Sequence, residues 1–387
     1  MTTDQRSIPF GRPWIDHAER DAVADVLNGP ILTHGPRCAA FEAAFADFIG
    51  GGCCCVAVSS CMAALHLSYL DLGIGPGDEV IVPAMTHVAT AHAVELVGAT
   101  PVFADCRTAD GNVDADVIEG LITERTKAVS TVHFQGIPCD MPAIQLIADK
   151  YDLAIVEDCA LAVGARHQST GRHVGTFGGT GCFSFYPIKH IAIGEGGMLV
   201  TTDEALADRV RKKQGFGIDR DHTQRATPGQ YDVTMLGLNY RMTEMQAAMG
   251  EVQVGKLEEN LRRRAANFAC LKEAVSTIKG VSVLDGPGNS HYALSLLLPD
   301  HLACERASII ANLKASGVGT SIYYPQPLPM MSYYADKYQA GRELWPNASR
   351  IADQSITLPV GPHLQQDDVD YIAVRVVEAL SRIGGRG

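Results

Sequence analysis

Short apolar runs rich in β-branched residues alternate with helical patterns between about residues 39 and 215. Each run is only three to five residues long and is followed by polar or glycine-containing segments, which is typical of buried strands. The pattern predicts seven strands, at Val56–Val58, Glu79–Val82, Pro101–Ala104, Ala128–Val132, Ala154–Val156, Cys182–Phe185 and Met198–Thr201.

The segments between these runs carry apolar residues at helical spacing. The predicted helices are Ala63–Leu72, Val88–Val97, Ala115–Ile122 and Met141–Lys150. Such alternation predicts an α/β fold with a mostly parallel central sheet and helices on both faces. A long helical stretch, Thr243–Ile278, then leads to the apolar run 292–298 and a helical pattern at 307–315, typical of a smaller α+β domain. We expect a large domain at 1–250 and a small one at 251–387.

Composition and charge restrict the class of protein. The chain has 387 residues, 46% hydrophobic residues and a formal net charge of −12, so its overall field repels nucleic acids and anionic membranes, and we expect neither as a partner. No apolar run is long enough to span a bilayer. The first five residues include an acid and start no apolar stretch, so we expect no leader peptide and a cytoplasmic location.

Eleven cysteines are irregularly spaced, and Cys53, Cys54 and Cys55 are contiguous. Adjacent strand residues point to opposite faces, so this triplet cannot by itself form a tetrahedral metal site. We therefore predict no metal and expect free cysteines that act as small buried apolar residues in a reducing compartment.

Lys189 lies between the predicted strand that ends at Phe185 and the glycine-rich turn 194–197. A lysine at such a junction is held close to the core, and burial makes its amine a usable nucleophile. Most lysines are instead solvated at the surface. Asp158 favours the functional interpretation of Lys189, because it ends another apolar strand at the edge where open α/β sheets bind ligands. Alone, Asp158 could equally cap a helix.

Together, Lys189 and Asp158 match the needs of pyridoxal phosphate. That cofactor needs a lysine for its aldimine and an acid that keeps the pyridine nitrogen protonated. The segments Glu157–Ala160 and Phe183–Lys189 then resemble the sugar aminotransferases of the DegT/DnrJ/EryC1/StrS family, and the similarity runs from Phe41 to Val360. The resemblance implies a fold type I transferase that moves an amino group from an amino acid, L-glutamate above all, to a keto sugar, usually one activated by a nucleotide.

The resemblance also implies roles for individual residues. The cofactor phosphate is expected at Cys61 and Met62, where a strand gives way to a helix, and at Ser184. His87 corresponds to the residue that stacks on the pyridine ring. Asn239 corresponds to an asparagine that reaches the phosphate from the neighbouring subunit, which implies a homodimer with shared active sites. By themselves, His87 and the 59–62 segment could be an ordinary helix start.

The family pattern is not matched at Cys61 and Met62, where the resembling enzymes carry a small residue and threonine, nor at Leu161 and Tyr323. Leu161 stands where relatives have a residue that hydrogen-bonds the cofactor's phenolic oxygen, and we hypothesise that Gln135 supplies this donor instead. Tyr323 stands in the acceptor-binding segment where relatives usually have histidine. Arg220 and Arg241 could bind a diphosphate, or could equally form surface ion pairs.

Four other functions compete with this prediction. The departure at Tyr323 leaves open a cyclitol ketone or another keto sugar without a nucleotide as acceptor. A related dehydratase branch replaces the lysine with histidine, so Lys189 argues against that activity. Cysteine desulfurases need a cysteine on a mobile loop, whereas most cysteines here fall in predicted strands and helices. A cofactor-binding regulatory protein is disfavoured because no DNA-binding module is visible.

Overall fold

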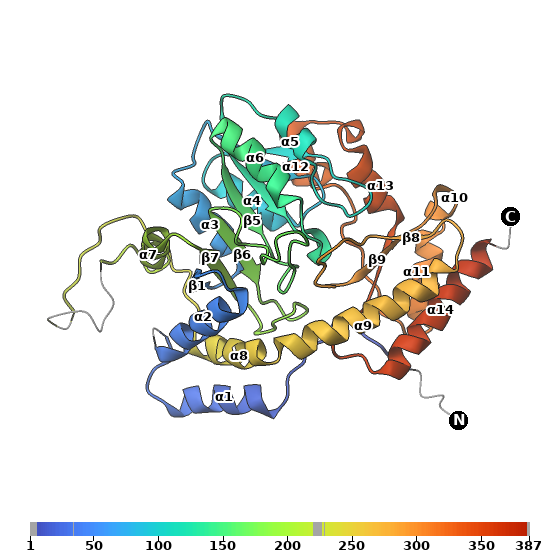
Figure 1. Ribbon diagram of the computed structural model, residues 1–387, viewed down its shortest axis with the longest axis horizontal. Helices are drawn as coiled ribbons and strands as arrows, with labels where there is room; N and C mark the ends of the chain where they lie inside the picture. The colour runs from blue at the N-terminus through green and yellow to red at the C-terminus, as the bar shows by residue number, and fades with distance from the viewer. Residues whose placement is uncertain (1–5, 34, 220–226, 228, 385–387) are drawn as a thin grey trace.

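A computed structural model describes residues 6–33, 35–219, 227 and 229–384 of the chain. Its centre is a seven-stranded sheet with strand order β1-β7-β6-β5-β4-β2-β3 (Figure 1). Only β7 runs against its neighbours in this sheet, so the prediction of a mostly parallel sheet is confirmed. The strands are β1 (Cys54–Val58), β2 (Glu79–Pro83), β3 (Thr100–Ala104), β4 (Thr126–Val132), β5 (Ala154–Asp158), β6 (Thr180–Ser184) and β7 (Gly197–Thr201).

Helices cover both faces of this sheet (Figure 1). One face packs on α3 (Cys61–Asp71), α4 (Val88–Leu96) and α7 (Glu204–Lys213), whose apolar residues share one cluster with Val56, Val156 and Leu199 of the strands. The other face packs on α2 (Pro36–Ile49), α5 (Ala115–Gly120) and α6 (Met141–Tyr151). Burying both faces explains why the strands are continuous apolar runs and do not alternate.

The second sheet is small and antiparallel, with order β10-β9-β8. Its strands are β8 (Ser282–Val283), β9 (Leu294–Leu297) and β10 (Ser355–Leu358). Helices α11 (Arg306–Ala315) and α14 (Gln366–Gly384) pack with it around a separate apolar cluster, which confirms the predicted α+β character of this region. The remaining helices are α1 (His17–Asn28), α10 (Asp300–Ala303), α12 (Ser332–Tyr338) and α13 (Pro346–Gln354).

The predicted helix Thr243–Ile278 is wrong as a single element. The structure has α8 (Glu244–Gly255) and α9 (Leu257–Ser276), separated at Lys256. Glycine is a poor helix former, so Gly255 weakens the helix at this point. The ammonium of Lys256 forms ion pairs with Asp16 and Glu19, which fastens the break to α1 and the segment before it.

The predicted division between residues 250 and 251 falls inside α8, and it stays a prediction. Apolar packing continues from the large sheet into the C-terminal part of the chain. Trp345 and Ile351 belong to the same cluster as Phe103 of β3, and the indole N–H of Trp345 donates to the Phe103 carbonyl at 3.0 Å. Within the described residues, no helix combines the length and apolar character needed to cross a membrane.

Candidate active site

Lys189 lies in the short segment between β6 and β7, and the structure leaves it only partly exposed. Its ammonium sits 4.9 Å from the centre of the Tyr292 ring. Burial lowers the pKa of Lys189 to about 8, while the negative charge of Asp158 acts in the opposite direction. The amine is therefore close to its titration midpoint near neutral pH, as a nucleophilic lysine requires.

Asp158 ends β5 and is 4% exposed. One carboxylate oxygen accepts a hydrogen bond from the Thr90 hydroxyl at 2.8 Å, and the other accepts from the Ala160 amide at 3.0 Å. The Thr90 hydroxyl also lies 2.8 Å from that of Thr86, so two buried threonines of the α4 start support the carboxylate. This support fixes the direction in which the carboxylate points.

The start of α3 lies beside Asp158. Ser60 caps this helix by accepting from the Ala63 amide, and the Cys61 thiol donates to the Cys182 carbonyl at 3.3 Å and lies 3.9 Å from Asp158. The first amides of a helix have no acceptor within it, so those of Cys61 and Met62 are available to an anion. A Cβ at Gly197 would lie 2.4 Å from the Ser60 carbonyl carbon, so only glycine lets β7 approach this closely.

Ser184 ends β6 and is buried. Asp158 is the β5 partner of Cys182, and Cys182 contacts Ser68 of α3, so Cys182 faces α3. Because side chains alternate along a strand, Ser184 lies on the same face. The sheet thus brings the predicted residues Lys189, Asp158, Cys61 and Ser184 to one edge.

His87 lies at the same edge. It caps α4 by accepting from the Ala89 amide at 3.2 Å, its ring is 5.9 Å from that of Tyr324, and it is exposed. The charges of Asp158 and Lys189 both act on its imidazole, which places His87 in the same cluster. His87 therefore both caps α4 and lies beside the site.

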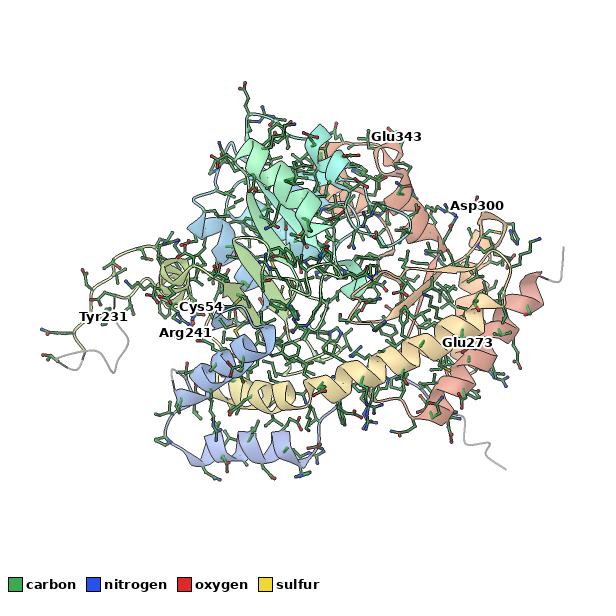
Figure 2. The ribbon with its side chains drawn as sticks, in the orientation of Figure 1. Cys54, Tyr231, Arg241, Glu273, Asp300 and Glu343 are labelled. Atoms are coloured by element: carbon green, nitrogen blue, oxygen red, sulfur yellow. The ribbon has the colours of Figure 1, made fainter. Side chains whose placement is uncertain are left out.

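Asn239 and Arg241 come from a segment that pairs with the end of β1, where Val58 bridges to Arg241. Asn239 is exposed and accepts a hydrogen bond from Arg241 at 3.1 Å. Figure 2 shows Arg241 on the side of the molecule from which Tyr231 projects. Arg220 lies outside the described residues.

Gln135 and Tyr323 are both buried, and each contacts a residue in the C-terminal part of the chain. The Gln135 amide nitrogen donates to Ser295 of β9 at 2.6 Å, while its side-chain oxygen has no partner among the described residues. The hypothesis that Gln135 compensates for Leu161 stays a prediction. The Tyr323 hydroxyl lies 2.7 Å from that of Tyr292, the residue whose ring contacts Lys189.

Thr90, Tyr292 and Arg264 lie at the site but were not predicted from the sequence. Thr86 and Thr90 are four residues apart at a helix start, a spacing that puts two hydroxyls on one face. Arg264 lies on the buried face of α9 with Leu257, Phe268 and Leu271, and a charge on an apolar helix face was the available signal. Tyr292 carried no local signal, because its contact with Lys189 is made across more than a hundred residues.

His133, Glu157 and Cys159 are close enough to hold a metal ion. Hydrogen bonds already occupy the first two. Glu157 accepts from the amides of Gly175, Phe177 and Gly178 at 2.7 Å each and from His133 at 3.0 Å. His133 Nδ1 accepts from the Cys139 amide, so Nε2 carries the proton and donates. This cluster is satisfied without an ion. All eleven cysteines are free, and most are buried, as expected.

Comparisons with known proteins agree with what the geometry of the site indicates. The model of the DegT/DnrJ/EryC1/StrS aminotransferase family matches residues 13–377. The chain is 35% identical over 383 residues to the uncharacterized protein MJ1066 of Methanocaldococcus jannaschii, and the match covers 97% of each chain.

Two solved structures show the same fold over nearly the whole chain. Helicobacter pylori PseC, an aminotransferase involved in the biosynthesis of pseudoaminic acid, superposes with a TM-score of 0.91 at 26% identity, covering 97% of this chain and 100% of PseC. The PLP form of Spr1654 from Streptococcus pneumoniae, named a putative sugar aminotransferase, gives 0.90 at 26% identity, covering 98% of this chain and 100% of Spr1654.

The side chains present fit pyridoxal phosphate. A lysine amine with a lowered pKa, a supported aspartate and a helix start with a nearby serine meet at one edge of the sheet. They match, in order, the aldehyde, the ring nitrogen and the phosphate of that cofactor.

Proposed function

Because this chain belongs to the DegT/DnrJ/EryC1/StrS aminotransferase family and depends on pyridoxal phosphate, we propose that it moves an amino group from L-glutamate to a nucleotide-activated keto sugar. The observation that carries the proposal is the convergence of Lys189, Asp158 and the start of α3 at one edge of the sheet, where the charge of Asp158 acts on a Lys189 amine whose pKa is lowered to about 8. The names of PseC and Spr1654 support a sugar as the acceptor.

Bound pyridoxal phosphate supplies an electron sink that stabilises negative charge on the substrate carbon. The residues of this chain do the rest. Lys189 Nζ, which is neutral in part at pH 7 to 8, would act as the base that takes the proton from the amine-bearing carbon of the donor and as the acid that releases it again. Asp158, held by Thr90 and the Ala160 amide, presents its carboxylate to the ring nitrogen.

The start of α3 and Ser184 are proposed to hold the phosphate through amides and a hydroxyl. Asn239 is proposed to reach the phosphate of a second subunit. Its own segment supports this, because Tyr231, Val233 and Leu236 expose 54%, 56% and 86% of their surface. Apolar residues this exposed are typical of a surface that another chain covers.

A second acceptor class is a ketone without a nucleotide, such as a cyclitol. The observation that favours it is Tyr323, a buried residue whose hydroxyl is engaged by Tyr292. A histidine at this position would offer an acceptor two different ring nitrogens. Tyr323 has only one hydroxyl, and that group already has a partner. It therefore offers the keto substrate fewer hydrogen-bonding atoms than a histidine would.

The proposal is tested by following nitrogen-15 from labelled glutamate into products by mass spectrometry. The purified, cofactor-loaded protein is incubated with a panel of nucleotide-linked keto sugars and free cyclitol ketones. We expect label in a nucleotide-linked amino sugar, and a loss of at least about a thousandfold in Lys189→Ala, because the amine is both nucleophile and proton carrier.

Lys212→Ala is the matched control, since Lys212 is exposed on α7 and should leave the rate unchanged. Label that appears only in a cyclitol would favour the second acceptor class. Turnover by Lys189→Ala at the wild-type rate would contradict the proposed role of this amine.

A further inference from the structure

Tyr292 offers the amine of Lys189 a ring face in the interior of the protein. The Lys189 Nζ lies 4.9 Å from the centre of the ring, and Tyr292 is only 3% exposed. Within the part of the chain that the structure describes, no group forms an ion pair or a hydrogen bond with this Nζ. An ammonium is attracted to the negative face of an aromatic ring, and more strongly where water is excluded. The Tyr292 ring is therefore the contact that holds the free amine.

The backbone of Tyr292 is held from two sides. Its amide donates to the Gln135 carbonyl at 3.3 Å, and its carbonyl accepts from Arg264 at 2.8 Å. The preceding residue, His291, has a φ of +55°, in the left-handed region that residues other than glycine adopt at a cost. The two hydrogen bonds therefore help to maintain an unfavourable backbone conformation, which presents the Tyr292 ring to Lys189.

The hydroxyl of Tyr323 holds the far end of the Tyr292 side chain. The two hydroxyl oxygens are 2.7 Å apart, and the rings meet edge to face, with centres 5.6 Å apart and planes at 79°. Tyr323 is itself buried and packs on Phe10, with ring centres 6.0 Å apart. A buried hydroxyl that loses its partner costs free energy. Without the Tyr323 hydroxyl, that of Tyr292 would turn toward another partner and carry its ring away from the lysine.

We propose that Tyr323 is a positioning residue that acts through the Tyr292 ring on Lys189, and that it keeps the lysine amine in place whenever the amine is not bonded to the cofactor. The inference rests on the proposed role of Lys189. The reaction creates the need for such support, because the donor amine displaces a lysine whose side chain is long and flexible. Holding the freed amine in one position shortens its search for the proton that it carries.

The titration of Lys189 reports on this contact. The charged and titratable groups that act on its amine are Asp158, Cys61, Arg264, His87 and His190. Burial raises the pKa of the Cys61 thiol and of both tyrosine hydroxyls, and lowers the pKa of the two imidazoles and that of Arg264, the latter to about 10. Lys189 therefore titrates near pH 8 among neighbours of nearly constant charge. A ring face that favours the ammonium raises the lysine pKa.

The sharpest test is a double-mutant cycle on the full chain freed of cofactor, with the pKa of Lys189 as the readout. Acetylation of Lys189 by trace acetic anhydride is followed by mass spectrometry across the titration, and its midpoint gives the pKa. We expect the pKa to fall by about one unit in Tyr292→Leu and by about half a unit in Tyr323→Phe. In the Tyr292→Leu background, Tyr323→Phe should cause no further fall, because it acts through that ring.

Tyr371→Phe is the matched control. It removes a hydroxyl that donates to the Ser316 carbonyl at 3.0 Å, beside the separate apolar cluster of the C-terminal region, and should leave the Lys189 pKa unchanged. Tyr292→Phe keeps the test valid if Tyr292→Leu folds poorly. It breaks the same hydroxyl contact as Tyr323→Phe, so the two single variants and their double variant should all show the same fall of about half a unit.

A wild-type pKa of Lys189 in Tyr323→Phe would overturn the proposal. An equal fall with and without the Tyr292 ring would overturn it as well, because Tyr323 would then act independently of that ring. A second readout is the rate at which the cofactor-free protein captures pyridoxal phosphate, whose pH midpoint should move with the Lys189 pKa. Failure of the proposed function has a different signature. In that case the cycle still shows coupling in the Lys189 pKa, but the pH midpoint of cofactor capture does not follow it.

Discussion

The two faces of β5 at its carboxyl end carry adjacent carboxylates with opposite tasks. Glu157 is fully buried and accepts four hydrogen bonds, three from backbone amides of the 175–178 loop and one from His133. Asp158, one residue on, faces α3 and α4, and its negative charge acts on Lys189 and His87. One carboxylate is saturated by the protein and the other keeps capacity for a ligand. Burial alone therefore does not identify a functional acid, but its remaining acceptor capacity does.

The largest expected effect is on stability, from Glu157→Ala. The substitution leaves three loop amides and the His133 N–H unpaired in the interior. We expect the free energy of unfolding to fall by about 3–5 kcal/mol. Urea denaturation monitored by circular dichroism measures this loss. A fall below about 1 kcal/mol would show that the loop finds other acceptors and that Glu157 is not its anchor.

Asp158→Asn should have the reverse effect of Glu157→Ala, with little change in stability and a large loss of reaction rate. Asparagine keeps the shape and can still accept from the Ala160 amide, so we expect a change in unfolding free energy within about 1 kcal/mol. Without the negative charge, the ring nitrogen is no longer kept protonated, and the rate of the glutamate half-reaction should fall at least about a hundredfold. Stopped-flow absorbance provides the rate, and a rate near that of the wild type would remove Asp158 from the proposed site.

Thr90→Val probes the support of Asp158 with a smaller effect. The variant removes the hydroxyl that donates to the carboxylate and that pairs with Thr86, but keeps the side-chain volume. We expect about a tenfold loss in the same half-reaction. Thr90→Ser, which restores the hydroxyl, should recover most of the rate. Equal rates in the valine and serine variants would assign Thr90 to packing only.

The smallest effect is the pH dependence of stability contributed by Lys189. Its pKa in the folded state, about 8, is below the usual 10.5, so the unfolded chain binds more protons between these two values. Stability of the cofactor-free protein should therefore rise with pH from about 8 to 10.5. Lys189→Met should lose this rise and exceed the wild type below pH 8, by less than about 1 kcal/mol because Lys189 is partly exposed. Unfolding curves at pH 7 and 10 test the sign.

Much of the fold was predictable because the strands of the large sheet are buried on both faces and so appear as apolar runs. The direction of β7 was not predicted, although only twelve residues without a helix separate it from β6. Parallel neighbours need a longer crossover, so this short connection was a usable signal. The break at Lys256 had a local signal in Gly255, but the ion pair that fastens it to α1 joins residues more than two hundred positions apart in the chain.

The site could be predicted as far as its residues follow strands. Asp158 and Lys189 were predicted because each stands at or just beyond the end of an apolar run, where a sheet edge collects ligand-binding groups, whereas Ser184 was predicted only from the resemblance to the family. Tyr292 and Arg264 reach the same place from the C-terminal part of the chain through contacts that no local pattern encodes. Their positions depend on how α9 and β9 pack against the large sheet.

The alternation of Glu157 and Asp158 also bears on engineering this enzyme. Because the two side chains point to opposite layers, a designer can adjust robustness at one position and reactivity at its neighbour with little interference. A single-residue insertion in β5 ahead of Glu157 has the opposite outcome. It would exchange the two layers, and a glutamate one carbon longer would then confront the coenzyme while the loop beneath lost its anchor.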